Sequence, residues 1–157
     1  MLSSLLSHET CARCRICCGF VECDKWEIPL FAGEEECSTA SELAGVRKLP
    51  GTKSCVFDMK FNGSEIVMCP AASEHGCVLG NKRPFDCRIW PFRVNDLNGT
   101  HVITLSPVCP AMIKLPLDKL MDFVNSDGFA QTLFRHAAEF PETVKPYEKG
   151  YPILAVE

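Results

Sequence analysis

The chain has 157 residues and a mass of 17.4 kDa, which is the size of one domain with a single core. Sixteen basic against 20 acidic residues give a net charge of −4, which argues against a general nucleic-acid binder and against a polybasic membrane surface. No apolar run approaches the roughly 18 residues of a membrane span, so we expect no membrane partner.

The N-terminal two thirds of the chain favour short and irregular elements. Residues 20–28 alternate enough to allow a brief strand, and residues 34–43 allow a short helix. The β-branched and apolar segments 54–61 and 64–68 flank Asn62-Gly63, a dipeptide typical of two-residue turns. These two segments therefore predict a β-hairpin.

The C-terminal third has clearer periodicity. Residues 88–94 and 101–105 predict a second hairpin around the turn sequence at 96–99. Apolar residues at helical spacing then predict helices over about 117–124 and 129–137.

No internal repeat or flexible linker divides the chain, so we predict a single domain over residues 1–157. Its expected fold class is α+β: a small, irregular, metal-organised domain with short β-hairpins and a C-terminal helical segment. Residues 11–110 would form the cysteine-rich metal-binding region, and residues 111–157 a helical brace for it.

Eleven cysteines are the most unusual feature of the composition. The N-terminus lacks a cationic segment followed by a long apolar run, so we expect no signal peptide and a cytoplasmic location. Structural disulfides are rare in that reducing compartment. An odd number of cysteines also excludes complete pairing within the chain. Metal binding is therefore favoured over a disulfide scaffold and over inert or catalytic thiols.

The cysteines gather in two segments far apart in the sequence. Thiolates are the soft ligands of zinc, copper(I) and iron–sulfur clusters, and a C-x2-C step lets two sulfurs reach one ion. We predict that both segments converge on a common inorganic centre. Two tetrahedral sites, or one site with the other thiols packed nearby, are both possible. The candidate ligands are Cys11, Cys14, Cys17, Cys18, Cys69, Cys77, Cys87 and Cys109.

Four further residues have an open role. Cys23, Cys37 and Cys55 are loosely spaced, and His75 lies two positions before Cys77, where it would complete a Cys3His site. A lone loop histidine more often faces solvent. The acidic run at 34–36 is interpreted as an exposed turn rather than as acid/base machinery.

Basic residues concentrate beside the cysteines. Segments 11–18 and 82–93 contain six of them and a single acidic residue, Asp86. Guanidinium groups stabilise a negatively charged metal–thiolate centre and lower thiol pKa values, although a basic face for an acidic partner is an alternative. The six are Arg13, Arg15, Lys82, Arg83, Arg88 and Arg93.

The pattern Cys11-x2-Cys14-x2-Cys17-Cys18-Gly19, followed by Gly76-Cys77 and Arg83-Pro84-x2-Cys87-Arg88-x2-Pro91-Phe92, resembles the YkgJ-type cysteine-cluster family, whose signature is CxxCxxCC. The resemblance covers residues 11 to about 110. The link between Cys69 and Cys77 departs from it, being less apolar than the family pattern.

The resemblance implies a zinc- or iron-chelating protein. Its chelating set would be the candidate ligands named above, with Cys109 the furthest from the motif. Arg83 and Arg88 would then donate hydrogen bonds around the site. A similar signature occurs in flagellin lysine methylases, where an iron–sulfur cluster is implied, but this chain has no recognisable methyl-donor motif.

The sequence thus predicts a cytosolic metal-binding protein that chelates zinc or iron, the latter as an ion or as an iron–sulfur cluster, through thiolates from two remote segments. Two alternatives stay open. One is an iron–sulfur redox or metal-cluster maturation enzyme, and the other is a zinc-stabilised interaction module with a basic binding face. No catalytic residue is assigned, and the sequence names no substrate or protein partner.

Overall fold

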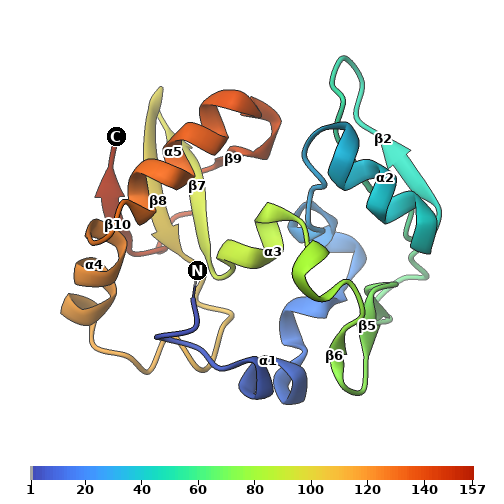
Figure 1. Cartoon of the computed structure of the whole chain (residues 1–157), viewed down its shortest axis with the longest axis horizontal. Helices are drawn as coiled ribbons and strands as arrows, with labels where there is room; N and C mark the ends of the chain where they lie inside the picture. Colours follow the sequence, from blue (N-terminus) through green and yellow to red (C-terminus); the bar gives the residue numbers. More distant parts are fainter. Residues whose placement is uncertain (1) are drawn as a thin grey trace. The chain divides into compact units, whose positions relative to one another are not determined.

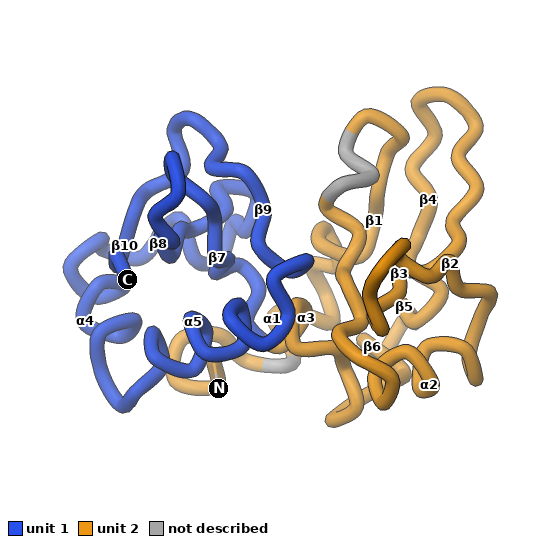
Figure 2. The backbone as a smooth tube through the Cα atoms, turned by 90° about the horizontal axis from the view of Figure 1, so that it is seen from above, with its two compact units in different colours: residues 1, 89–157 blue, residues 2–88 orange. Residues whose placement is uncertain are grey.

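The computed structural model describes residues 2–157, except the side chains of His8, Asp24, Lys25 and Trp26. The chain divides into two compact units, an N-terminal unit of residues 2–88 and a C-terminal unit of residues 89–157 (Figure 2). Helices and short antiparallel strand pairs occur together, so the fold class is α+β, as predicted. Over residues 2–157, no helix has the length and apolar character that crossing a membrane requires.

The N-terminal unit is built from short elements joined by irregular loops (Figure 1). Its strands form three separate two-stranded antiparallel sheets, β1–β4, β2–β3 and β5–β6. The elements are α1 (His8–Cys14), the 3-10 helix η1 (Ile16–Cys18), β1 (Gly19–Phe20), η2 (Glu22–Glu27), α2 (Gly33–Leu43), β2 (Val46–Lys48), β3 (Cys55–Phe57), β4 (Val67–Met68), β5 (Ala72–Ser73), β6 (Gly76–Cys77), η3 (Gly80–Lys82) and α3 (Phe85–Ile89).

The predicted helix at 34–43 is confirmed by α2, whereas the predicted hairpin 54–61/64–68 is wrong. Strand β3 pairs with β2, and β4 pairs with β1. Gly63 does adopt a positive φ of 63° in a turn, but the chain there connects two different sheets. The predicted strand at 20–28 is also wrong beyond its first residue, because η2 follows.

The core of the N-terminal unit lies between α2 and β3. Phe31 and Phe57 meet edge to face with their ring centroids 4.8 Å apart, and Ala40 is fully buried beside them. Cys37 of α2 and Cys55 of β3 are joined by a disulfide, and both are buried. Two of the three loosely spaced cysteines, Cys37 and Cys55, therefore form a disulfide within the core.

The C-terminal unit contains one four-stranded sheet in the order β10–β8–β7–β9. The predicted hairpin is confirmed, with its strands turning at Asn98 and Gly99, whose φ values are 55° and 87°. Its first strand begins at Phe92 rather than at residue 88, because residues 88 and 89 end the helix α3. The predicted helices are confirmed as well. The elements are β7 (Phe92–Leu97), β8 (Thr100–Leu105), α4 (Leu117–Asn125), α5 (Phe129–Glu139), η4 (Pro141–Thr143), β9 (Lys145–Pro146) and β10 (Ile153–Val156).

Helices α4 and α5 pack on this sheet, α4 against β10 and α5 against β7 and β8 (Figure 1). Phe92 is fully buried and contacts two aromatic rings from the helical part, Phe123 at 5.8 Å and Phe129 at 5.4 Å between centroids. The hairpin thus belongs to the same unit as the helices, and Cys109 lies in this unit too.

The Cys37–Cys55 disulfide should contribute measurably to stability. Reducing it is expected to lower the free energy of unfolding by about 3 kcal/mol, because the bond joins residues 18 positions apart and restricts the unfolded chain. Urea unfolding of metal-free protein, with and without a phosphine reductant, measures the difference. Cys55→Ala should abolish the response to reductant, whereas Cys23→Ser, at an exposed position, should keep it. Equal stability of the wild type in both conditions would contradict this prediction.

Candidate metal centre

Helix α1 carries the first two cysteines of the motif. Ser7 caps its N-terminus, and the Ser7 hydroxyl accepts a hydrogen bond from the Thr10 backbone N–H at 3.1 Å. Cys11 and Cys14 are three residues apart, so their side chains lie on the same side of the helix. Cys11 is half-buried, whereas Cys14 is exposed.

The turn after α1 reverses the chain and so positions Cys17 and Cys18, the second half of the motif. Arg15 ends the helix with a φ of 51°, in the left-handed region, and the Cys18 N–H donates to the Arg15 carbonyl at 2.9 Å. This reversal leads into η1, which carries Cys17 and Cys18 side by side. The Arg15 guanidinium donates to the Ser73 carbonyl at 3.4 Å, which ties the turn to the β5–β6 hairpin.

Backbone pairing brings the second cysteine segment to the first. Strand β1 pairs with β4, with Gly19 opposite Met68, and the Cys69 N–H donates to the Cys18 carbonyl at 2.6 Å. A Cβ at Gly19 would lie 3.0 Å from the Ile66 side chain, closer than such atoms normally approach. A larger residue after the motif would therefore require the exposed Ile66 side chain to shift.

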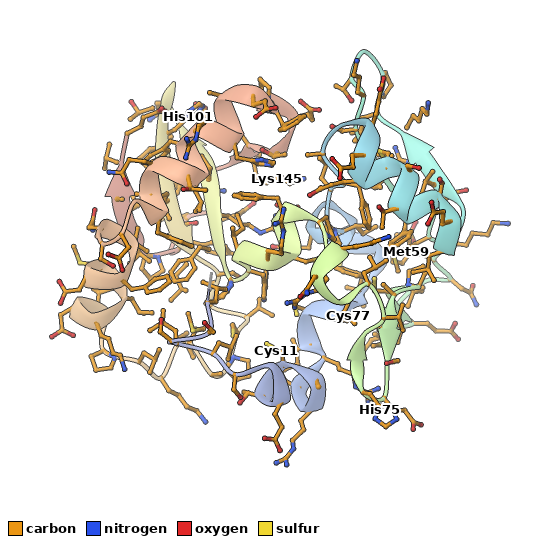
Figure 3. The ribbon with its side chains drawn as sticks, viewed as in Figure 1. Cys11, Met59, His75, Cys77, His101 and Lys145 are labelled. Carbon is orange, nitrogen blue, oxygen red and sulfur yellow. A yellow bond between two sulfur atoms is a disulfide. The ribbon has the colours of Figure 1, made fainter. Side chains whose placement is uncertain are left out.

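Cys77 reaches the same region on the β5–β6 hairpin. Gly76, with a φ of 110°, allows the tight turn before it. Cys69 and Cys77 both pack against the buried core of the N-terminal unit, and α1 packs against β6, so Cys77 and Cys11 lie in the same region (Figure 3). His75 is exposed and points away from both at the hairpin tip (Figure 3).

Helix α3 carries Cys87 and is held by the carboxylate of Glu36. Its Oε1 accepts from the Phe85 backbone N–H at 2.9 Å and lies 3.4 Å from the Arg88 guanidinium, while Oε2 accepts from the Ala32 N–H at 2.9 Å. The prediction of an exposed acidic turn is therefore wrong for Glu36, whose side chain is 19% exposed.

A second carboxylate fixes the other side of α3. Asp86 accepts a hydrogen bond from the Leu30 backbone N–H at 3.0 Å, and Leu30 itself is buried. Carboxylates that accept backbone N–H bonds make strong, directional links. Glu36 and Asp86 therefore set the position from which Cys87 faces the other thiols.

Four thiols from four segments converge in the N-terminal unit, and we call them the inner thiols. Each of their six pairs interacts electrostatically. Cys17 interacts with two of them and with Cys11. In this conformation, the described side chains include no group of three or more His, Cys, Asp or Glu placed to hold a metal ion. The inner thiols are Cys18, Cys69, Cys77 and Cys87.

The inner thiols differ in their acidity. A hydrogen bond from the Cys17 thiol, helped by Arg83 and Arg15, lowers the pKa of Cys18 to about 7. Burial raises the pKa of Cys69 to about 11 and also raises the pKa of Cys77.

Burial acts most strongly at Cys87, where it raises the thiol pKa well above the ordinary value. The same pairing that stabilises the Cys18 thiolate raises the pKa of Cys17, the hydrogen-bond donor. Cys18 is therefore the most acidic thiol of this group.

The other residues that the sequence predicted for the site lie in different surroundings. Arg83 lies within electrostatic range of Cys18 and Cys77. Arg88 instead faces Glu36 and the Phe85 ring, 5.5 Å from its centroid. Cys14, Cys17 and Cys23 are exposed, and Cys109 belongs to the C-terminal unit.

No protein-family model, curated protein or solved structure matches this chain. The relation to the YkgJ-type family therefore stays a prediction from the cysteine motif.

Glu36 should give the N-terminal unit a pH-dependent stability. Burial raises its pKa above the ordinary 4.5, against the lowering effect of the Ala32 and Phe85 N–H donors. The folded state then holds its proton to higher pH than the unfolded state, so this group makes stability fall as pH rises from about 4.5 through the raised pKa. Glu36→Gln removes the effect.

Relative to wild type, the free energy of unfolding of Glu36→Gln is expected to increase with pH, by at most about 1.4 kcal/mol per pH unit. Urea unfolding at steps from about pH 4 to about pH 7 measures this slope. Glu35→Gln, at the exposed neighbouring position, is the matched control and should parallel the wild type. If the free energy of unfolding of Glu36→Gln instead decreased with rising pH relative to wild type, a raised pKa of Glu36 would be contradicted.

Proposed function

We propose that the N-terminal unit binds a soft metal through the inner thiols, as zinc or as iron, the latter either as an ion or in an iron–sulfur cluster. The observation that carries the proposal is the convergence of Cys18, Cys69, Cys77 and Cys87 from four separate segments. Four sulfurs suit both a structural zinc site and an iron–sulfur cluster. The resemblance to YkgJ-type proteins points to the same chemistry.

The supports around these thiols favour a bound cation. Cys18 and Cys69 are linked through their backbones, and Cys87 is held through α3 by Glu36 and Asp86. These links do not involve the sulfur atoms, so the sulfurs stay available as ligands. Arg83 would offset the excess negative charge of a metal–thiolate centre.

Binding would also reorganise the thiols. Burial keeps three of them protonated near neutral pH, and an arriving cation would replace those protons because metals bind thiolates. The side chains would also have to turn toward a common point, since none of the described groups is already placed around one. Metal binding and local ordering of the N-terminal unit are therefore coupled in this proposal.

A second candidate role follows from the exposure of the motif. Cys17 is exposed and interacts with Cys18 and Cys87, so a metal held there would remain accessible from outside. Accessible thiolates exchange metal or electrons with partners more readily than enclosed ones. This favours an iron–sulfur redox or metal-cluster maturation function as the second candidate.

Metal content tests the proposal directly. Protein purified anaerobically after supply of zinc, or of iron with sulfide, is analysed for metal and sulfide, and its visible spectrum is recorded. Broad absorption near roughly 400 nm indicates an iron–sulfur cluster, because zinc is colourless. Cys18→Ser and Cys87→Ser should lose the metal, whereas Cys23→Ser should retain it. Unchanged metal content in both inner-thiol variants would refute the proposal, and Cys109→Ser reports whether the C-terminal unit contributes a ligand.

Arg83 provides a test that leaves every thiol in place. Arg83→Gln is expected to weaken metal affinity about tenfold, because residues that surround ligands tune their affinity. Competition with a chromogenic chelator measures the change, and Lys82→Gln, an exposed neighbour, is the matched control. Equal affinity in Arg83→Gln and Lys82→Gln would exclude a role for Arg83 beside the thiols.

A further inference from the structure

The chain contains two asparagine–glycine pairs, Asn62-Gly63 and Asn98-Gly99, and neither belongs to the candidate metal centre. Asparagine is chemically labile in proteins, because the backbone nitrogen of the next residue can attack its side-chain carbonyl carbon. Glycine hinders that attack least, since it has no Cβ. Both asparagines are exposed, but the structure gives their backbones different surroundings.

The Asn98-Gly99 turn is closed by paired strands. Leu97 of β7 pairs with Thr100 of β8, so Asn98 and Gly99 form the two-residue loop of the hairpin. The Gly99 N–H also donates to the Asp96 carboxylate at 3.0 Å. Attack by the Gly99 nitrogen would therefore break a charge-assisted hydrogen bond and distort a turn that the two strands hold in place.

The Asn62-Gly63 turn has neither restraint. It lies in the connection between β3 and β4, where residues 58–66 form no helix or strand. The bond that closes the turn, from the Glu65 N–H to the Asn62 carbonyl, is 3.5 Å long.

The two groups that would react at this turn are also accessible. In the described part of the chain, no hydrogen bond holds the Gly63 N–H, and a Cβ at Gly63 would meet no atom within 4 Å beyond its chain neighbours. The Asn62 side chain makes one long contact, between its Nδ2 and Glu65 Oε2 at 3.5 Å. The Gly63 nitrogen can therefore approach the Asn62 side chain without breaking a strong interaction.

We propose that Asn62 is a site of spontaneous deamidation. The Gly63 backbone nitrogen gives up its proton and forms a bond to Cγ of Asn62, which closes a succinimide ring. The bond from Cγ to the side-chain nitrogen breaks, and this nitrogen takes up a proton and leaves as ammonia. Water then opens the ring at either carbonyl and leaves aspartate or isoaspartate. Overall, one water is consumed and one ammonia is released, without oxidation or reduction.

The products would change this turn chemically. Both place a carboxylate beside Glu65, where the amide of Asn62 now donates to it, and two like charges repel each other. Isoaspartate also lengthens the backbone by one atom. Its carboxylate is the group that protein isoaspartyl methyltransferases recognise, so the aged chain would become a substrate of that enzyme class.

Peptide mapping by mass spectrometry compares the two asparagines directly. The full-length protein is incubated at mildly alkaline pH and sampled over time. Asn62 is expected to convert about tenfold faster than Asn98, which is the order of the effect of one hydrogen bond to a charged group. Asp96→Ala, at an exposed position, removes the acceptor of the Gly99 N–H. It should accelerate conversion of Asn98 and leave the rate at Asn62 unchanged.

Methyl transfer measures the isoaspartate itself. Aged wild type should accept more labelled methyl groups from a protein isoaspartyl methyltransferase than fresh protein does. Asn62→Gln should lose most of this increase, because glutamine would have to close a larger ring, whereas Asn98→Gln is the matched control and should keep it. Both positions are exposed, so the variants should fold. Absence of conversion at Asn62, conversion of Asn98 as fast as that of Asn62, or a full increase in Asn62→Gln would overturn the proposal.

Discussion

The backbone hydrogen bond from Cys69 to the Cys18 carbonyl is the contact on which the N-terminal unit is organised. It extends the β1–β4 pair by one step and joins the two cysteine segments directly at their sulfur-bearing residues. Gly19 eases the approach, because a larger residue there would require the exposed Ile66 side chain to shift. Once this pairing forms, the remaining cysteine-bearing elements need only short links to reach the same region.

The links between these elements are mostly hydrogen bonds from side chains to the backbone. Long β-sheet ladders and a large apolar core contribute less. The three sheets of this unit have strands of only two or three residues. Glu36 and Asp86 bind backbone N–H groups around α3, and Arg15 binds a carbonyl of the β5–β6 hairpin. The cost is visible at Glu36, whose burial raises its pKa even though three donors surround it. The carboxylate that holds the Cys87 helix in place is therefore partly desolvated.

How much the sequence predicted depends on how local the determining interactions are. Helices α4 and α5 and the Asn98-Gly99 hairpin follow from periodicity and turn chemistry within a few residues, and all were predicted. The pairing of β1 with β4 was missed because two-residue strands show no alternation and pair with residues far away in the sequence. Glu36 was missed because a run of three glutamates indicates solvent exposure until the fold brings Phe85 to one of them. Motif spacing predicted that eight cysteines converge, whereas the fold was needed to single out the inner four and to assign Cys109 to the other unit.

The eleven cysteines divide according to what surrounds them rather than according to their spacing. Cys37 and Cys55 lie in the apolar core, where a disulfide replaces a packing contact and solvent has little access. The inner thiols lie at the edge of that core, with two of them packed on it and arginines facing Cys18. In the apolar core, two sulfurs stabilise the fold by forming a disulfide. At the edge of the core, the inner thiols keep their sulfurs available as metal ligands. The same core therefore shields the disulfide and supports the thiols, which is how one small unit uses cysteine for two different purposes.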